Sequence, residues 1–206
     1  MSINFRKTVF LSVAANLDMC PRNDLPEVVL AGRSNVGKSS FINALGDNRT
    51  LAKVSSMPGK TKLVVYFLAD GRMLFADLPG YGYAKAAKED KSKYQGLVDD
   101  YLTSGRKFAL VIHFIDIRHQ PSAEDRLMKD WLESQGLPYF IVLTKADKLS
   151  KLQMNQRAAQ IRSEMNVPEN IPVLPLGNKE GIDPIKAAIE RLHRWPASSD
   201  KVGNRP

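Results

Sequence analysis

The sequence contains a single cysteine, Cys20, and it has no long uninterrupted run of apolar residues. One cysteine cannot form a disulfide within the chain, which excludes a small fold stapled by disulfide bridges. The longest apolar stretch, near Phe108–Ile117, is shorter than the ~18 residues that a helix needs to span a bilayer. The N-terminus lacks the basic stretch, apolar core and cleavage site of a signal peptide, so we expect a cytoplasmic protein without membrane contact.

Histidine is also scarce, and the sequence has no internal repeat or low-complexity tract. His113, His119 and His193 are spaced like neither metal ligands nor a catalytic triad, so we expect ordinary core or surface histidines. Acidic residues are outnumbered, with 22 Asp and Glu against 30 Lys and Arg, a formal net charge of +8. This charge favours a polyanionic partner such as RNA, although it is equally compatible with ordinary solubility.

The length of 206 residues and the 43% hydrophobic content are sufficient for one sizeable core. We therefore expect one domain over residues 26–195. An N-terminal extension over residues 1–25 is expected to pack on this domain or flank it, and residues 196–206 are expected to form a loose tail.

Nearly continuous apolar runs of strand length alternate with segments of helical length. Such runs are typical of strands buried on both faces, which predicts an α/β fold: a three-layer sandwich with a mainly parallel sheet between helices. The six predicted strands are Glu27–Ala31, Lys62–Leu68, Arg72–Asp77, Lys107–Asp116, Pro138–Thr144 and Ile171–Leu174. The predicted helices are Lys38–Leu45, Lys88–Thr103, Ala123–Gln135, Lys151–Met165 and Pro184–Arg194.

One pair of predicted strands is joined directly by a tight turn, Ala69–Arg72. This turn predicts one antiparallel strand, Lys62–Leu68, at the edge of an otherwise parallel sheet. Residues Phe5–Val13 are a candidate for a further short strand or a cover over the domain. Ser122 followed by Asp125 is typical of a helix start.

The segment Gly32–Ser39 matches the phosphate-loop pattern, with an apolar strand before it and a helix after it. We expect Lys38 to reach the β and γ phosphates of a nucleotide, Ser39 to offer its hydroxyl to Mg²⁺, and Ser40 to lie near the α phosphate. The predicted nucleotide contacts here are Gly32, Arg33, Ser34, Asn35, Val36, Gly37, Lys38, Ser39 and Ser40. The alternative interpretation is an ordinary glycine-rich turn.

The segment Asp77-Leu78-Pro79-Gly80 ends the third predicted strand. We expect Asp77 to hold Mg²⁺ through water and Gly80 to present its N–H to the γ phosphate, with Leu78 and Pro79 as further nucleotide contacts. An aspartate before Pro-Gly is more often a simple turn. Its place after a phosphate loop favours the functional interpretation.

The segment Thr144-Lys145-Ala146-Asp147 follows the fifth predicted strand and indicates a guanine base. The Asp147 carboxylate can accept hydrogen bonds from guanine N1–H and the 2-amino group, a donor pair that adenine lacks. The stem of Lys145 would lie over the base. The alternative is a charged loop in which Asp147 caps the next helix.

Thr61 lies directly before the second predicted strand, and we expect it to be a second protein ligand of Mg²⁺. Lys38, Thr61 and Gly80 are the residues expected to act in hydrolysis. The neighbouring predicted nucleotide contacts are Gly59, Lys60, Lys62 and Leu63. Taken alone, Thr61 could equally be a plain residue at the start of a strand.

This ordered set resembles the EngB (YihA/YsxC) family, bacterial GTP-binding proteins of ribosome biogenesis related to the translation-factor GTPases. The resemblance covers most of the chain from Gly32 to Gly181. It rests on Gly32–Ser40, Pro58–Thr61, Asp77–Ala84, Asp116–His119 and Thr144–Asp147. It implies a P-loop GTPase that binds GTP, GDP and Mg²⁺ and acts as a switch on the large ribosomal subunit or its precursor, and it implies a need for the protein in cell division and septation.

Two positions differ from what such a GTPase leads us to expect. The family has two serines after the last strand, where this chain reads Leu174-Pro175-Leu176-Gly177-Asn178. We expect Leu176, Gly177 and Asn178 to contact the nucleotide, with the backbone N–H of Leu176 or Gly177 bonded to the base, since Pro175 has no N–H to donate. Tyr81 stands where many GTPases place a glutamine that orients water. We therefore expect slow hydrolysis, completed by a partner or by K⁺ held partly at Asn35.

Other function classes stay open at this point. A P-loop ATPase or kinase would explain the phosphate loop but has no use for Thr144–Asp147. An RNA-assembly module that only needs bound nucleotide for its structure is compatible with Tyr81. We expect a monomer that binds no DNA. Asp116 and Arg118 are expected to form a structural ion pair rather than a partner contact.

Overall fold

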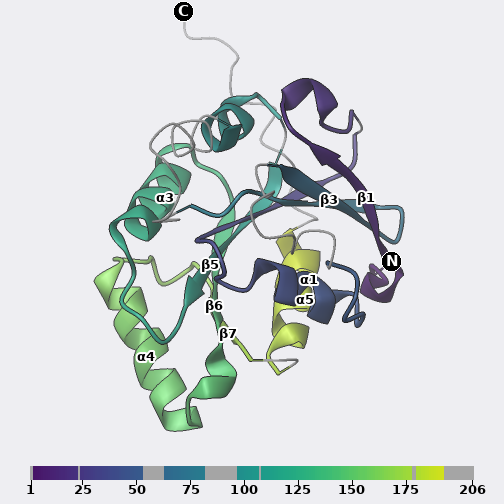
Figure 1. The fold of residues 1–206 in the computed structure, drawn as a ribbon. Helices are drawn as coiled ribbons and strands as arrows, with labels where there is room; N and C mark the ends of the chain where they lie inside the picture. Colours follow the sequence, from purple (N-terminus) through teal and green to yellow (C-terminus); the bar gives the residue numbers. More distant parts are fainter. Residues whose placement is uncertain are drawn as a thin grey trace, which may run out of the picture.

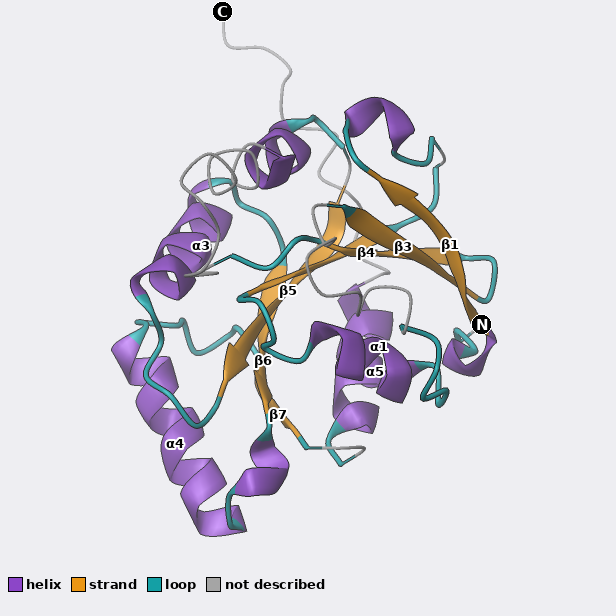
Figure 2. Ribbon diagram, viewed as in Figure 1, coloured by secondary structure: helices purple, strands orange, loops and turns teal. Residues whose placement is uncertain are grey.

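The computed structural model describes residues 2–22, 24–52, 63–81, 97–106, 108–177 and 180–192. In these residues one seven-stranded sheet runs through the molecule, with helices on both of its faces (Figures 1 and 2). The strands are β1 (Thr8–Ala14), β2 (Glu27–Gly32), β3 (Val64–Ala69), β4 (Met73–Asp77), β5 (Phe108–Asp116), β6 (Tyr139–Thr144) and β7 (Val173–Leu176). Their order across the sheet is β1-β3-β4-β2-β5-β6-β7.

The helices are α1 (Lys38–Leu45), α3 (Ala123–Ser134), α4 (Lys151–Glu164) and α5 (Ile182–Leu192), with a further helical segment at residues 97–103. Short 3₁₀ turns lie at Phe5–Lys7, Leu17–Met19 and Ala146–Lys148. The predicted helix start at Ser122 is confirmed as a capping box, because the side chain of Asp125 also returns to the N–H of Ser122.

The predicted α/β sandwich and its antiparallel hairpin are confirmed. Strands β2, β4, β5, β6 and β7 are parallel, and β3 runs antiparallel to β4. The expected count of six strands and the edge position of the hairpin strand are wrong. A seventh strand, β1, pairs antiparallel along β3 and occupies the edge, which satisfies backbone groups that β3 would otherwise leave open.

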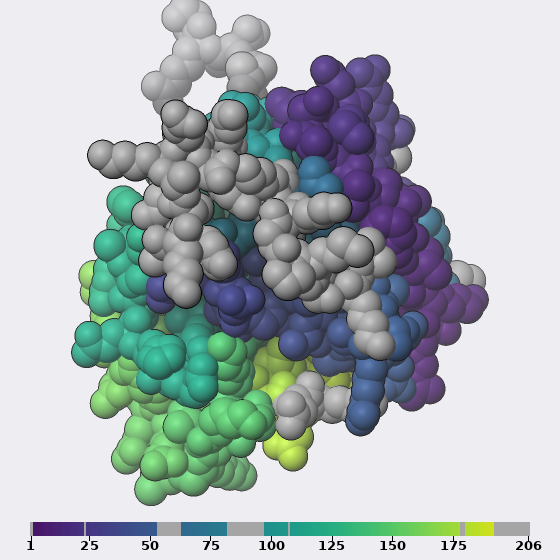
Figure 3. Space-filling model, in the orientation of Figure 1, coloured from purple at the N-terminus to yellow at the C-terminus, as the bar shows by residue number. Residues whose placement is uncertain are grey.

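Two apolar layers hold the sheet between its helices. On one face, Phe41 of α1 and Ile185 of α5 pack with Leu30 and Phe114 of the central strands. On the other face, the packing partners come from α3, α4 and the segment 97–103. Burial on both faces explains why the central strands are almost wholly apolar. In the space-filling view the N-terminal residues form one flank and α4 lies on the opposite side (Figure 3).

The N-terminal residues are tied into the sandwich by more than strand pairing. Phe5 packs against Phe75 of β4 with ring centroids 6.4 Å apart, and both side chains are buried. The N–H of Ile3 donates to Glu190 of α5 at 2.8 Å. These contacts join β1 to the same layer as α1 and α5. Within the described part of the chain, no helix is long and apolar enough to cross a membrane.

Candidate functional site

The predicted motifs meet at the carboxyl ends of the parallel strands, where ligands bind in open α/β sheets. The loop Gly32–Ser39 joins β2 to α1, Asp77 ends β4, and Thr144 ends β6. Because these strands are parallel and neighbour or nearly neighbour one another, segments far apart in the sequence converge on one edge.

The loop Gly32–Ser39 is packed so tightly that two of its positions require glycine. A Cβ on Gly32 would lie 2.8 Å from the carbonyl oxygen of Phe114. Gly37 has φ of 120°, a conformation that side chains disfavour, and its Cα faces Thr144. Asn35 also has positive φ, at 60°. The result is a compact loop at the start of α1, the arrangement that turns backbone N–H groups toward an anion.

Lys38 and Asp77 form a buried pair beside this loop. Their side chains are 9% and 8% exposed, and Lys38 Nζ lies 3.6 Å from Asp77 Oδ1. Burial raises the pKa of Asp77, and the nearby ammonium group offsets this only in part. Oδ1 of Asp77 has no hydrogen-bond partner among the described residues. An orphaned carboxylate oxygen close to the first turn of α1, which carries Ser39, fits a site for Mg²⁺.

The segment after β4 lies directly against the phosphate loop. The N–H of Ser34 donates to the carbonyl of Tyr81 at 3.0 Å, and Ser34 Oγ donates to the carbonyl of Gly80 at 3.0 Å. A Cβ on Gly80 would approach the N and Cα atoms of Ser34 to 2.6 Å. Gly80 is therefore required here by close backbone approach. Leu78 and Pro79 are buried between β4 and this contact.

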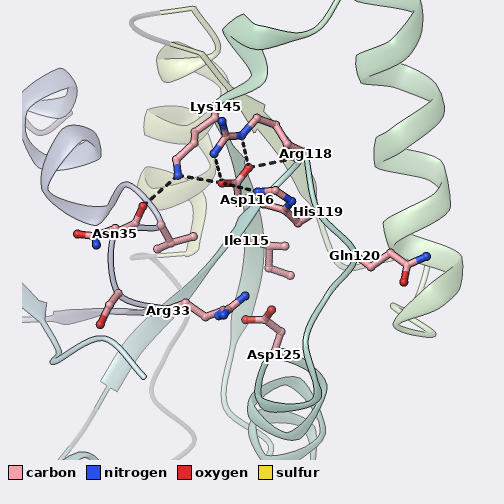
Figure 4. Close-up of a pocket in the computed structure, with 11 residues that line it drawn as sticks. Arg33, Asn35, Ile115, Asp116, Arg118, His119, Gln120, Asp125 and Lys145 are labelled. Carbon is pink, nitrogen blue, oxygen red and sulfur yellow. Dashed lines mark hydrogen bonds and ion pairs between the residues drawn. The ribbon is translucent and has the colours of Figure 1, made fainter. Parts of the chain in front are cut away.

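The segment Thr144–Asp147 is bonded to the phosphate loop from the other side. Thr144 Oγ1 donates to the carbonyl of Val36 at 2.6 Å, and Lys145 Nζ donates to the carbonyl of Asn35 at 3.1 Å. Lys145 adopts φ of 61°, and its ammonium group also lies 2.8 Å from Asp116 (Figure 4). One lysine thus joins the phosphate loop to the ends of β5 and β6.

Asp116 is held by two cations. Arg118 Nη2 lies 2.8 Å from Asp116 Oδ2, and Arg118 Nε donates to Oδ1 at 2.9 Å, which confirms the predicted ion pair. Burial raises the pKa of Asp116, but hydrogen bonds from Arg118 and Lys145 outweigh it and hold that pKa well below its usual range. Asp116 therefore stays charged and keeps Lys145 in place.

Asp147 is at the surface of the site, within the 3₁₀ turn that follows Lys145. Its carboxylate lies 2.9 Å from Lys148 Nζ, which lowers the pKa of Asp147, and it is available to a base. The residue after β7 packs on it, because a Cβ on Gly177 would lie 3.3 Å from the N and Cβ atoms of Asp147. The Gly177 N–H donates to the carbonyl of Glu180 at 3.0 Å, so this donor is engaged within its own loop.

The structure describes some of the remaining sequence-predicted contacts and not others. Leu63 lies just before β3, Ser40 lies in the first turn of α1, and Leu176 is buried at the end of β7. The predicted residues outside the described part of the chain are Gly59, Lys60, Thr61, Lys62 and Asn178. The predicted second ligand of Mg²⁺, Thr61, therefore stays a prediction.

Tyr81, in the segment after β4, belongs to a side-chain cluster that the sequence did not reveal. Tyr81 Oη is 2.7 Å from Nε2 of His113 on β5 and donates to Oδ1 of Asp125 on α3 at 2.8 Å. His113 is fully buried and Asp125 is 3% exposed. No spacing could mark these residues as a group, because they come from three separate elements. Only the capping pattern of Ser122 and Asp125 was visible.

An open pocket of about 220 Å³ lies between the phosphate loop, the end of β5 and the start of α3. Charged side chains dominate its walls, and the guanidinium of Arg33 extends toward Asp125 across it (Figure 4). Lys145, Asp116 and Arg118 line its other end. The pocket therefore opens beside the candidate nucleotide site and reaches the cluster around Tyr81.

Comparison with known proteins agrees with this geometry. Residues 27–145 match a family model described as 50S ribosome-binding GTPase. The chain is 40% identical to a probable GTP-binding protein EngB of Syntrophomonas wolfei over 192 residues, which cover 93% of this chain and 100% of that protein. It is 39% identical to a probable GTP-binding protein EngB of Streptococcus sanguinis over 92% of this chain and 98% of that protein.

Solved structures show the same fold at lower sequence identity. A crystal structure of a probable GTP-binding protein engB superposes with a TM-score of 0.66 at 19% identity, covering 82% of this chain and 98% of that chain. The cytosolic domain of the T. maritima FeoB iron transporter, in a GDP form, gives a TM-score of 0.53 at 20% identity, covering 86% of this chain and 66% of that chain.

Proposed function

The chain belongs to the EngB family of GTP-binding proteins, and from this membership we propose that it is a Mg²⁺-dependent GTPase that acts as a switch in assembly of the large ribosomal subunit. One observation carries the proposal for this chain's own residues. Thr144 and Lys145 are hydrogen-bonded to Val36 and Asn35 of the phosphate loop, so a segment able to read guanine lies beside a loop able to hold phosphates. A P-loop ATPase or kinase has no need for that pairing.

The roles of the residues follow from their places in the site. Lys38 reaches the β and γ phosphates, and Ser39, Asp77 and Thr61 hold Mg²⁺, which neutralises charge on the phosphate oxygens. Gly80 presents its N–H to the γ phosphate. The orphaned oxygen of Asp77 and the packing of Gly80 on Ser34 support these assignments.

Hydrolysis by the isolated protein is slow in this proposal. The residue in the position of a catalytic glutamine is Tyr81, and its hydroxyl is already hydrogen-bonded to His113 and Asp125 within the protein. A ribosomal partner, or K⁺ held partly by Asn35, then completes the site. Single-turnover hydrolysis with and without K⁺ and ribosomal particles measures this contribution, and indifference to both would contradict it.

The proposed partner is the large ribosomal subunit or its precursor, met by a monomer in the cytoplasm, with defects in cell division and septation when the protein is lost. The family model's description and the net charge of +8 support a partner that contains RNA. The alternative role, in which nucleotide only stabilises an RNA-assembly module, predicts equal binding to particles with GDP and with a non-hydrolysable GTP analogue. Sedimentation with ribosomal subunits in the two states separates the two roles.

The base assignment is tested by Asp147→Asn. Xanthine carries a carbonyl where guanine has its 2-amino group, and an asparagine amide can donate to it, so preference should move from GTP to xanthosine triphosphate. The loss of GTP affinity should be about 30-fold or more, because a charged hydrogen bond is removed. Competition against labelled GDP measures both nucleotides.

A matched control is Asp130→Asn, which neutralises an exposed aspartate on α3 and should leave nucleotide preference unchanged. Unchanged GTP affinity in Asp147→Asn would remove Asp147 from the site. Displacement of labelled GDP by ATP as effectively as by GTP would reject the guanine assignment altogether.

A further inference from the structure

Tyr81 is tied to the protein through both its side chain and its backbone. Its hydroxyl lies 2.7 Å from Nε2 of His113 and donates to Oδ1 of Asp125 at 2.8 Å. A hydroxyl has one proton, so when it donates that proton to Asp125 its oxygen accepts a hydrogen bond from His113 Nε2–H. The other ring nitrogen, Nδ1, has no hydrogen-bond partner among the described residues.

The backbone of the same residue is bonded to the phosphate loop. Its carbonyl accepts from the N–H of Ser34, and the carbonyl of the preceding Gly80 accepts from Ser34 Oγ, both at 3.0 Å. Arg33 and Tyr81 form an isolated parallel bridge. Gly80 therefore sits between two fixed points, the phosphate loop on one side and the hydrogen-bonded phenol of Tyr81 on the other.

Asp125 extends this connection into α3. Its Oδ2 accepts the N–H of Ser122 at 2.8 Å, and its N–H donates to Ser122 Oγ at 3.2 Å. One carboxylate thus caps α3 and holds Tyr81. Burial raises the pKa of Asp125, but the nearby His113 ring, 3.8 Å away, and the hydrogen bonds from the Ser122 N–H and the Tyr81 hydroxyl outweigh it and lower that pKa. Burial, and then Asp125, raise the pKa of Tyr81, so the phenol stays a donor and the carboxylate an acceptor.

We propose that Tyr81 is a positioning residue for the third phosphate: held by His113 and Asp125, it fixes the backbone of Gly80 against the phosphate loop and links that phosphate to the start of α3. This inference rests on the proposed role of Gly80 as the contact to the γ phosphate. A backbone N–H that is already in place binds its ligand without the entropic cost of ordering the loop. We call the hydrogen bonds that hold Tyr81 to His113 and Asp125 the tether. GDP has no third phosphate, so its affinity gains nothing from the tether.

The test is Tyr81→Phe, which removes the hydroxyl and keeps the ring. Affinities for GDP and for a non-hydrolysable GTP analogue are measured with Mg²⁺. The preference for the analogue over GDP should fall by about 3- to 10-fold, the effect of a lost hydrogen-bonded anchor, while GDP affinity is retained. A purely structural role would lower thermal stability without moving this ratio.

Tyr139→Phe is the matched control. It removes a tyrosine hydroxyl that donates to Glu133 Oε1 at 2.6 Å, from a side chain that is buried at the start of β6, away from the phosphate loop. This variant should lose stability and keep the wild-type ratio of affinities. Asp125→Ala, which removes the acceptor of the Tyr81 hydroxyl, should lower the ratio as Tyr81→Phe does, and the double variant should show no further loss, because the same contact is already broken.

The outcomes separate the tether from the function on which it rests. If the wild-type protein prefers the GTP analogue and Tyr81→Phe keeps that preference, the tether is refuted and the proposed function stands. The tether is also refuted if both nucleotides lose affinity equally. If Tyr81→Phe does not fold, the ratio in Asp125→Ala decides in the same way. A wild-type protein that binds no guanine nucleotide would refute the proposed function first.

Discussion

Lys38 and Asp77 form a buried ion pair that bears on both the stability of the fold and the proposed binding of nucleotide. The carboxylate lies 3.6 Å from the ammonium group, and the side chains of both residues are less than 10% exposed. Burying an ion pair costs solvation, and removing one partner leaves the other charge uncompensated. In the proposed function, a triphosphate with its metal would add a second countercharge to each member of the pair, phosphate beside Lys38 and Mg²⁺ beside Asp77.

Lys38→Met keeps the aliphatic stem and removes the charge. Without nucleotide, the free energy of unfolding should fall by about 3 kcal/mol, since Asp77 is left buried without its counter-ion. GDP affinity should fall about 10- to 100-fold through loss of a charged hydrogen bond to phosphate. Urea unfolding and fluorescence titration with labelled GDP measure the two effects.

Lys129→Met is the control for this change, because Lys129 on α3 is also buried and paired, with Asp130 and Glu133. It should lose stability and retain GDP affinity. Wild-type GDP affinity in Lys38→Met would show that Lys38 does not contact the phosphates.

Among the elements, the central strands were predictable in full, whereas β1 was expected only as a candidate short strand or cover at Phe5–Val13. Strands β2, β5 and β6 are buried along nearly their whole length, and their continuous apolar sequences indicated this. Strand β1 carries Val9, Phe10 and Leu11 with 39–52% exposure. The sequence of β1 has neither the continuous apolar pattern of a buried central strand nor polar residues along one outer face. Its position at the edge of the sheet is therefore known only from its pairing with β3.

Deletion of residues 1–14 tests the contribution of β1. The truncated chain loses the buried side chains of Ile3 and Phe5, and its free energy of unfolding should fall by about 3 to 6 kcal/mol. Strand β3 would become the sheet edge, and an open edge favours pairing between molecules. Thermal unfolding and sedimentation velocity measure stability and self-association.

Arg6→Ala is a control within the same segment, because the Arg6 side chain is 77% exposed and makes only a 3.7 Å ion pair with Asp47. It should leave both properties close to wild type. If the truncated chain stays monomeric and as stable as the full chain, β1 contributes neither to stability nor to protection of the sheet edge.

For the whole molecule, the sequence predicted which segments would form the candidate site but not how they are joined. Gly32–Ser39, Asp77–Gly80 and Thr144–Asp147 could be located because each pattern is local and follows a strand. The contact of Lys145 with Asn35 and the cluster of Tyr81 with His113 and Asp125 could not, since they depend on how separate strands pack. Thr61 lies outside the described residues, so its role still comes from the sequence.

The net charge of +8 gives a prediction at this scale. If the partner presents RNA phosphates, binding releases counterions, and affinity for ribosomal subunits should fall roughly tenfold or more between 50 and 200 mM salt. GDP affinity measured at the same two salt concentrations is the control and should change much less. Particle binding that does not depend on salt would argue against RNA as the main contact.

The bonds from Thr144 and Lys145 to the phosphate loop also bear on how the protein exchanges its nucleotide. Both bonds join protein atoms only, so no nucleotide is needed to bridge these two segments. We therefore expect that the nucleotide-free protein stays folded, and that GDP dissociates without an exchange factor. For the proposed switch, the ratio of GTP to GDP in the cell would then decide which nucleotide binds next.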